Sequence, residues 1–186
     1  PNSEAGRTAL NFGGSGQLDN GLFISGNVNY VNTTQSTPQM GPSIYTDYSG
    51  GAESSIYARV FYLPRNYDLN GLPFENPVNG NNVFYRALDN PHWIAKYNTY
   101  SSTVNRVYGN MTFGYDIKDW LNVTFKGGVN TYTENRKSII RKGGTALPAG
   151  QMWNDDLTNT EQDYNLIFTF TKDFSENFNF RGILGG

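Results

Sequence analysis

The sequence offers few side chains that could bind a metal ion or a phosphate group. His92 is the only histidine and the chain has no cysteine, whereas metal sites in proteins assemble several such ligands. The run Gly13-Gly14-Ser15-Gly16 has the composition of a phosphate-binding loop, but no Lys-Ser or Lys-Thr pair follows it and it lies inside a strand-like pattern. We therefore predict no metal and no cofactor. His92 is expected to be an ordered loop residue, and the glycines are expected to allow close packing or a bend.

Acidic side chains are scattered through segments that we expect to be loops. A glycosidase would need two of them about 5–10 Å apart, and the sequence indicates no such pair. The Asn-rich stretch 76–82 contains oxygen ligands of the kind that calcium prefers, but turn formation accounts for the same composition. We expect solvated carboxylates and predict that the protein is not an enzyme; the residues concerned are Asp68, Asp89, Asp155, Asp156, Glu161 and Asp163.

Aromatic side chains in the same segments are better candidates for binding, because the apolar faces of sugar rings can pack against them. The alternative is that most of them pack the loops against one another or against a partner protein. As candidate substrate-binding residues we take Arg65, Asp89 and Trp93. The aromatic residues of these segments are Tyr45, Tyr48, Tyr62, Tyr67, Phe84, Tyr85, Trp93, Tyr97 and Tyr100.

The stretch 105–133 predicts two long strands joined by a tight turn at Lys118-Asp119. Alternation of apolar and polar residues persists well beyond the roughly 5–6 residues of an ordinary strand and fits the roughly 9–11 residues that a tilted strand needs to cross a bilayer. One face carries Val107, Met111, Phe113, Tyr115, Ile117, Leu121, Val123, Phe125 and Val129. The other face, expected to line a hydrated interior, carries Asn110, Thr112, Asn122, Thr124, Lys126 and Asn130.

Similar alternation predicts strands at 8–18, 22–32 and 161–174, and a further strand that begins at Phe178. Short turns are expected at 19–21 and 175–177. Long irregular regions are expected at 33–103 and 134–160, the first with a short helix at 52–63 that Ser54 or Ser55 would cap. Short and long connections therefore alternate, as do the periplasmic turns and extracellular loops of outer-membrane barrels.

Composition agrees with a strand-based membrane protein. Charged residues make up 16% of the chain, well below the roughly 25% of a typical soluble domain. No apolar run is long enough for a membrane-spanning helix, and a net charge of −2 without a basic stripe gives no support for a nucleic-acid partner. We predict an all-β fold, namely an antiparallel transmembrane β-barrel segment of about six long strands in three hairpins. The alternative is a secreted soluble β-sandwich or carbohydrate-binding module, which would bury the same apolar faces between two sheets.

Three short motifs add a family resemblance that covers essentially the whole chain. They are Leu63-Pro64-Arg65, Asp89-Asn90-Pro91-His92-Trp93 and Asn105-Arg106-Val107-Tyr108-Gly109-Asn110. In this order and spacing the chain resembles the SusC/RagA family of TonB-linked outer-membrane transporters. Residues 1–186 would then be part of the barrel domain of a TonB-dependent receptor, without its plug domain or signal peptide.

The resemblance implies a 22-stranded plugged barrel in the outer membrane of a Gram-negative bacterium. It also implies import of oligosaccharides or peptides, contact with membrane lipid, a SusD-like lipoprotein as partner, and the TonB system acting through the plug domain. Six strands leave two unpaired edges, which hydrocarbon does not tolerate. We therefore expect the chain to form part of a larger assembly.

Overall fold

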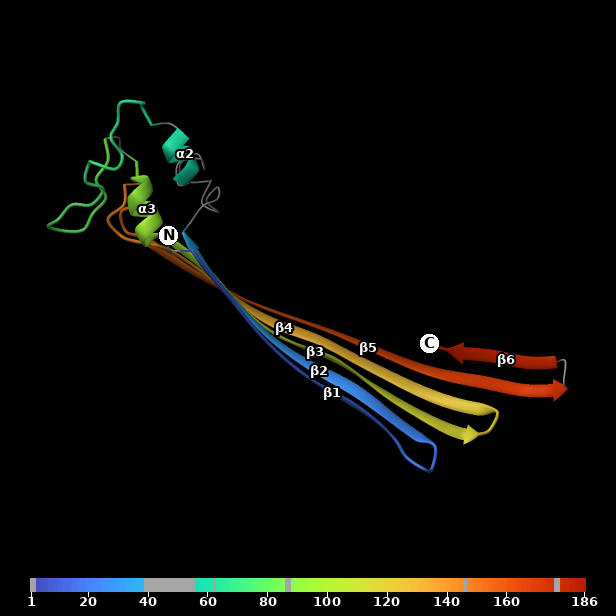
Figure 1. The fold of residues 1–186 in the computed structure, drawn as a ribbon. Helices are drawn as coiled ribbons and strands as arrows, with labels where there is room; N and C mark the ends of the chain where they lie inside the picture. The colour runs from blue at the N-terminus through green and yellow to red at the C-terminus, as the bar shows by residue number, and fades with distance from the viewer. Residues whose placement is uncertain (1–2, 39–55, 62, 86–87, 146, 176–177) are drawn as a thin grey trace. The chain divides into compact units, whose positions relative to one another are not determined.

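The computed structural model describes residues 3–38, 56–61, 63–85, 88–145, 147–175 and 178–186 (Figure 1). Six strands form one open antiparallel sheet in the order β1-β2-β3-β4-β5-β6, so each strand is hydrogen-bonded to its neighbours in the sequence. This confirms the all-β class and the strand count. The elements are β1 (Glu4–Gln17), β2 (Leu22–Pro38), α2 (Ile56–Phe61), α3 (Pro91–Tyr97), β3 (Thr99–Lys118), β4 (Leu121–Ile140), β5 (Gln151–Ser175) and β6 (Phe178–Gly185).

The hairpin turns lie close to the predicted positions. Between β1 and β2, Gly21 has a φ of 83°, a conformation that glycine adopts without steric cost. The Leu22 N–H donates to the Asn20 side chain over 3.1 Å, which helps to fix the turn. The second turn is formed by Asp119 and Trp120, one residue later than predicted. The predicted third turn includes residues 176–177, which lie outside the described residues.

The strands extend much further than the alternation predicts, so the expected loop at 134–160 is wrong. β4 continues to Ile140 and β5 already begins at Gln151, which leaves only residues 141–150 as the connection. The irregular region expected at 33–103 is likewise too long, since β2 reaches Pro38 and β3 begins at Thr99. These extensions are mostly polar, although Ile140 at the end of β4 is buried. Hydrogen bonds between side chains of neighbouring strands contribute to their stability. For example, Ser102 donates to Glu134 over 2.8 Å and Asn135 donates to Asp156 over 2.6 Å.

Between β2 and β3, the described residues include two short helices. α2 falls inside the predicted helix at 52–63, of which residues 52–55 and 62 lie outside the described residues. α3 was not predicted, because its seven residues are too few to show helical periodicity. The proline at its first turn and the Asn90 side chain, which accepts from the His92 N–H over 2.9 Å, are ordinary helix-start features. His92 therefore lies on a helix and not in a loop.

The chain divides into two compact units. The sheet unit comprises residues 7–32, 104–133 and 157–186, and the loop unit comprises residues 1–6, 33–103 and 134–156. Trp93 and Ile94, both in the loop unit, are fully buried. Neither described helix has the length and apolar character needed to span a membrane.

Candidate functional site

One face of the sheet unit is apolar and exposed on every strand. Cross-strand ring pairs show that the apolar positions of neighbouring strands share this face: the ring centroids of Phe125 and Tyr164 are 6.2 Å apart, and those of Trp120 and Phe170 are 6.4 Å apart. In the β5–β6 pair, Phe168 lies opposite Leu184. The exposed apolar side chains of this face include Leu10, Phe12, Ile24, Val28, Val107, Met111, Phe113, Ile117, Phe125, Val129, Leu166 and Leu184.

An exposed apolar surface that extends over six strands is not expected to face water in the assembled protein. Phe12 is 70% exposed and Leu184 is 67% exposed, although they lie on β1 and β6 at the two ends of the strand order. Monomeric soluble proteins rarely expose continuous apolar patches larger than a few hundred Å². We define this surface as the apolar face of the sheet unit.

The opposite face is held together by polar side chains that bond across strands. Arg106 on β3 donates through Nε to Asn130 on β4 over 2.8 Å, and Asn130 donates to Glu161 on β5 over 2.9 Å. Nearer the β3–β4 turn, Asn122 donates to Asp116 over 2.7 Å. Such a polar network suits a wet surface, where side chains can exchange hydrogen bonds with water.

The same polar face contains a hollow of about 350 Å³. Lys126 and Asp163 contribute opposite charges to its wall, and Asn110, Thr112 and Asn165 contribute amide and hydroxyl groups. Three residues of the predicted hydrated face, Asn110, Thr112 and Lys126, therefore lie together around one space.

In the loop unit, Trp93 and Asp89 form part of a buried core. Trp93 Nε1 donates to the Gly80 carbonyl over 3.2 Å, and Asp89 accepts from the Thr145 N–H. Gly144 packs between them, because an added Cβ would lie 3.0 Å from Asp89 Oδ1 and 3.2 Å from Trp93. This arrangement joins α3 to the β4–β5 connection.

Two asparagines reinforce this core. Asn90 is fully buried; its N–H donates to Asn82 over 2.7 Å and its side chain donates to the Val83 carbonyl over 3.2 Å. Asn82 in turn donates to the Leu88 carbonyl over 2.8 Å and to Thr145 over 3.0 Å. Because unpaired buried amides are costly, these bonds explain why the Asp89–Trp93 motif and the Asn-rich stretch adopt fixed positions.

The three predicted binding residues differ in their exposure to solvent. Asp89 and Trp93 lie together and are buried to 3% and 0% exposure, whereas Arg65 is exposed in a turn with Asn66. As described, Asp89 and Trp93 stabilise the loop unit and present almost no surface to a ligand. A role in substrate binding stays a prediction for all three residues.

Three other loop aromatics form a partly exposed cluster. The ring centroid of Tyr67 lies 4.7 Å from that of Tyr85 and 5.5 Å from that of Phe84, and Phe84 and Tyr85 are 4.8 Å apart. Burial raises the pKa of Tyr67, and nearby Tyr85 and Asp68 raise it further. Tyr85 is 42% exposed, whereas Tyr67 and Phe84 are half-buried, so Tyr85 provides most of the accessible aromatic surface of the cluster. Of the other predicted loop aromatics, Tyr45, Tyr48 and Tyr62 lie outside the described residues.

A charged network that the sequence did not indicate surrounds Glu75. Its carboxylate accepts from Lys96 Nζ over 2.8 Å and from the Tyr97 hydroxyl over 2.7 Å. The Arg141 guanidinium lies 3.8 Å from the Tyr97 ring centroid, within cation–π range. The hydrogen bonds from Lys96 and then Tyr97 lower the pKa of Glu75. These contacts join residues that are far apart in the sequence, so no local sequence motif predicts them.

The Glu75 network predicts that acid weakens the loop unit. Because the Glu75 pKa is lower in the folded chain, the folded state binds the proton less well than the unfolded state. The stabilisation is therefore complete above the ordinary glutamate pKa and is lost as the pH falls through the lowered one. We expect the hydrogen-exchange protection factors of the α3 amides, which are corrected for the intrinsic pH dependence of exchange, to fall across this pH range. In Glu75→Gln this fall should be smaller, and an identical pH profile of protection in the two proteins would contradict the assignment.

Among the described residues, no group of His, Asp and Glu side chains is arranged to hold a metal ion. His92 Nε2 instead lies 3.1 Å from Asn70 Oδ1. No protein-family model matches the chain, and neither does any curated protein.

Proposed function

We propose that the chain is a wall segment of an outer-membrane β-barrel and belongs to a transporter of the TonB-linked SusC/RagA type that its sequence resembles. The observation that carries this proposal is the apolar face of the sheet unit, which is exposed on all six strands and backed by a polar, hydrogen-bonded face. A barrel wall has this asymmetry, since its outer face meets lipid and its inner face meets water.

Strand length supports the same proposal. β1 to β5 contain between 14 and 25 residues, more than the roughly 9–11 that a tilted strand needs to cross a bilayer. The outer edges of β1 and β6 would expose unpaired backbone groups in hydrocarbon. We therefore propose that further strands pair with both edges and close the barrel.

Aromatic side chains near the hairpin turns support an interfacial position for that end of the strands. Trp120 stacks near Phe170, and the rings of Phe174 and Phe178 are 5.7 Å apart. These four residues lie beside the short connections, where outer-membrane barrels carry an aromatic girdle.

The loop unit is the proposed region of contact with substrate and partner. In the cluster of Tyr67, Phe84 and Tyr85, the exposed ring of Tyr85 offers aromatic surface of the kind that stacks against sugar rings. The proposed substrates are oligosaccharides or peptides, and the proposed partners are a SusD-like lipoprotein and the TonB system. The family resemblance supplies these identities.

Thiol labelling tests the two faces directly, because the printed sequence contains no cysteine. Phe125→Cys places a thiol on the apolar face, and Lys126→Cys places one on the polar face one residue away. In outer membranes of the native host, we expect a charged maleimide to modify the thiol at 126 and leave the thiol at 125 unmodified. A lipid-soluble maleimide should modify the thiol at 125.

The same labelling separates the barrel from a soluble β-sandwich. In a sandwich the thiol at 125 would lie between two sheets, so both reagents would modify it only after denaturation. Modification of both thiols by the charged reagent in intact membranes would also overturn the proposed lipid-facing role.

A further inference from the structure

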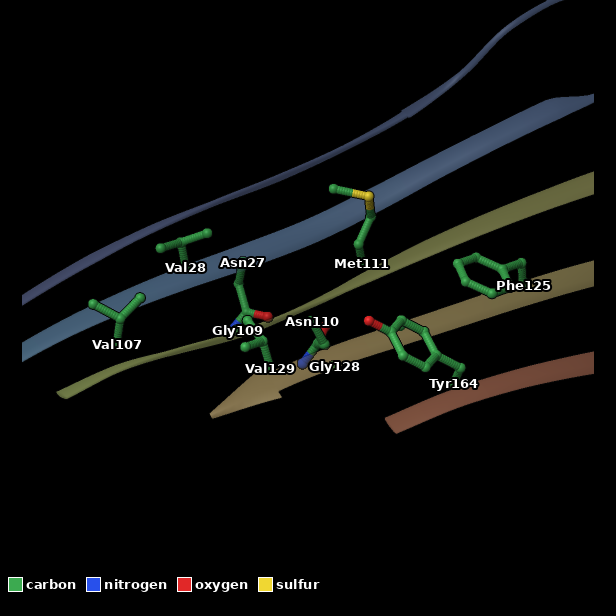
Figure 2. Close-up of a pocket in the computed structure, with 11 residues that line it drawn as sticks. Asn27, Val28, Val107, Gly109, Asn110, Met111, Phe125, Gly128, Val129 and Tyr164 are labelled. Atoms are coloured by element: carbon green, nitrogen blue, oxygen red, sulfur yellow. The ribbon is translucent and has the colours of Figure 1, made fainter. Parts of the chain in front are cut away.

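A groove of about 280 Å³ is cut into the apolar face of the sheet unit, over β2, β3, β4 and β5 (Figure 2). Three glycines, Gly109, Gly127 and Gly128, line it together with Asn27 and Asn110. Its remaining apolar wall is formed by Val28, Val107, Met111, Phe125, Val129 and Tyr164. The groove is therefore a recess in the exposed apolar surface and not a cavity of the loop unit.

Gly109 and Gly127 both contribute to this recess, but the packing around them differs. A Cβ on Gly109 would overlap the Asn27 carbonyl oxygen, so close approach of β2 and β3 requires glycine there. A Cβ on Gly127 would make ordinary contacts of 3.5 Å with Phe125 and 3.6 Å with Tyr164. Glycine weakens a strand interior, and at position 127 the packing does not demand it. The residue leaves open a space that a side chain could have filled.

We propose that this groove holds an alkyl chain of a membrane lipid. The inference rests on the proposed membrane position of the sheet unit and adds a preferred lipid contact to it. None of the lining residues carries a charge, so the groove has no group that would select an ionic ligand. The wall residues Val28, Met111, Phe125 and Tyr164 are also members of the apolar face, so the recess is continuous with the surface proposed to meet hydrocarbon.

The size of the groove supports a single chain as occupant. Its volume of about 280 Å³ lies just below the roughly 300–1,000 Å³ of small-molecule sites, so it admits part of a lipid and not a whole one. A stable protein partner would bury about 800 Å² on each side, which a recess of this size does not supply alone. A flexible alkyl chain fits an uncharged recess of this size.

Photocrosslinking tests this inference on the protein purified from its native host and placed in bilayers that contain a phospholipid with a diazirine in its acyl chain. We expect peptides that contain Met111 and Val129 to be labelled several-fold more than the β6 peptide that contains Phe180 and Leu184, which lies on the same face. Gly127→Val should lower groove labelling to the level of the β6 peptide. Gly14→Val is the matched control, because β1 places it on the apolar face and no described heavy atom lies within 4 Å of its added Cβ.

Each outcome separates the two proposals. Equal labelling of the groove and β6 peptides, or unchanged groove labelling in Gly127→Val, would overturn the groove inference and leave the barrel intact. Crosslinks from the groove to protein would also overturn it. If neither peptide reacted with lipid, the barrel proposal itself would fail. Should Gly127→Val not assemble, Gly127→Ala adds only the tolerated Cβ and should lower groove labelling in part.

Discussion

Replacement of Phe113 by arginine is expected to destabilise the proposed barrel by about 2–4 kcal/mol, the cost of a basic side chain near the bilayer midplane on a lipid-facing surface. Phe113 lies on the apolar face, between Val107 and Ile117 on β3, and is 36% exposed. The arginine would exchange an apolar contact with lipid for a charge in hydrocarbon. Urea-induced unfolding from lipid vesicles measures the difference in free energy.

The adjacent polar position provides the control. Thr112→Arg places the same side chain on the same strand but in the polar hollow that contains Asp163, so we expect a much smaller change in the free energy of unfolding. Equal decreases in the free energy of unfolding for Thr112→Arg and Phe113→Arg would show that the two faces do not differ in environment. That result would count against both the membrane position and the assignment of the inner face.

Replacement of Trp93 by alanine is expected to cost about 3–5 kcal/mol, the usual range for truncation of a buried tryptophan. Trp93 is fully buried, its indole donates to the Gly80 carbonyl over 3.2 Å, and its ring contacts Tyr97 at a centroid distance of 5.5 Å. We expect this loss of stability to be confined to the loop unit. Amide hydrogen exchange should therefore accelerate in α3 and leave the sheet unit little changed.

Trp93→Phe separates packing from hydrogen bonding. It keeps a buried ring but removes the donor to Gly80, so we expect a cost of about 1–3 kcal/mol for the unpaired carbonyl, smaller than the cost of alanine. If Trp93→Ala weakened substrate binding and left α3 exchange unchanged, Trp93 would act as a ligand contact, as first predicted, and its structural role would be overturned.

The sequence by itself determined the strand core of the sheet unit. Side chains of a strand alternate between two faces with a period of two residues. The alternation of apolar and polar residues from Val107 to Ile117 and from Leu121 to Val129 therefore predicted both the extended structure and the shared apolar face. The pair Asn20-Gly21 likewise predicted its turn, because the ability of glycine to adopt a positive φ depends on that residue alone. These features depend on neighbours in the chain, which the sequence shows directly.

Tertiary structure alone decided the ends of the strands and the organisation of the loop unit. The extensions to Pro38 and Ile140 are mostly polar and depend on pairing with a neighbouring strand, so no regular alternation of apolar and polar residues predicts them. The burial of Asp89 and Trp93 depends on Gly144 and Thr145, more than fifty residues away along the chain. Hydrogen bonds and packing between such distant residues leave no periodic pattern in the sequence, and only the folded chain shows which side chains they remove from solvent.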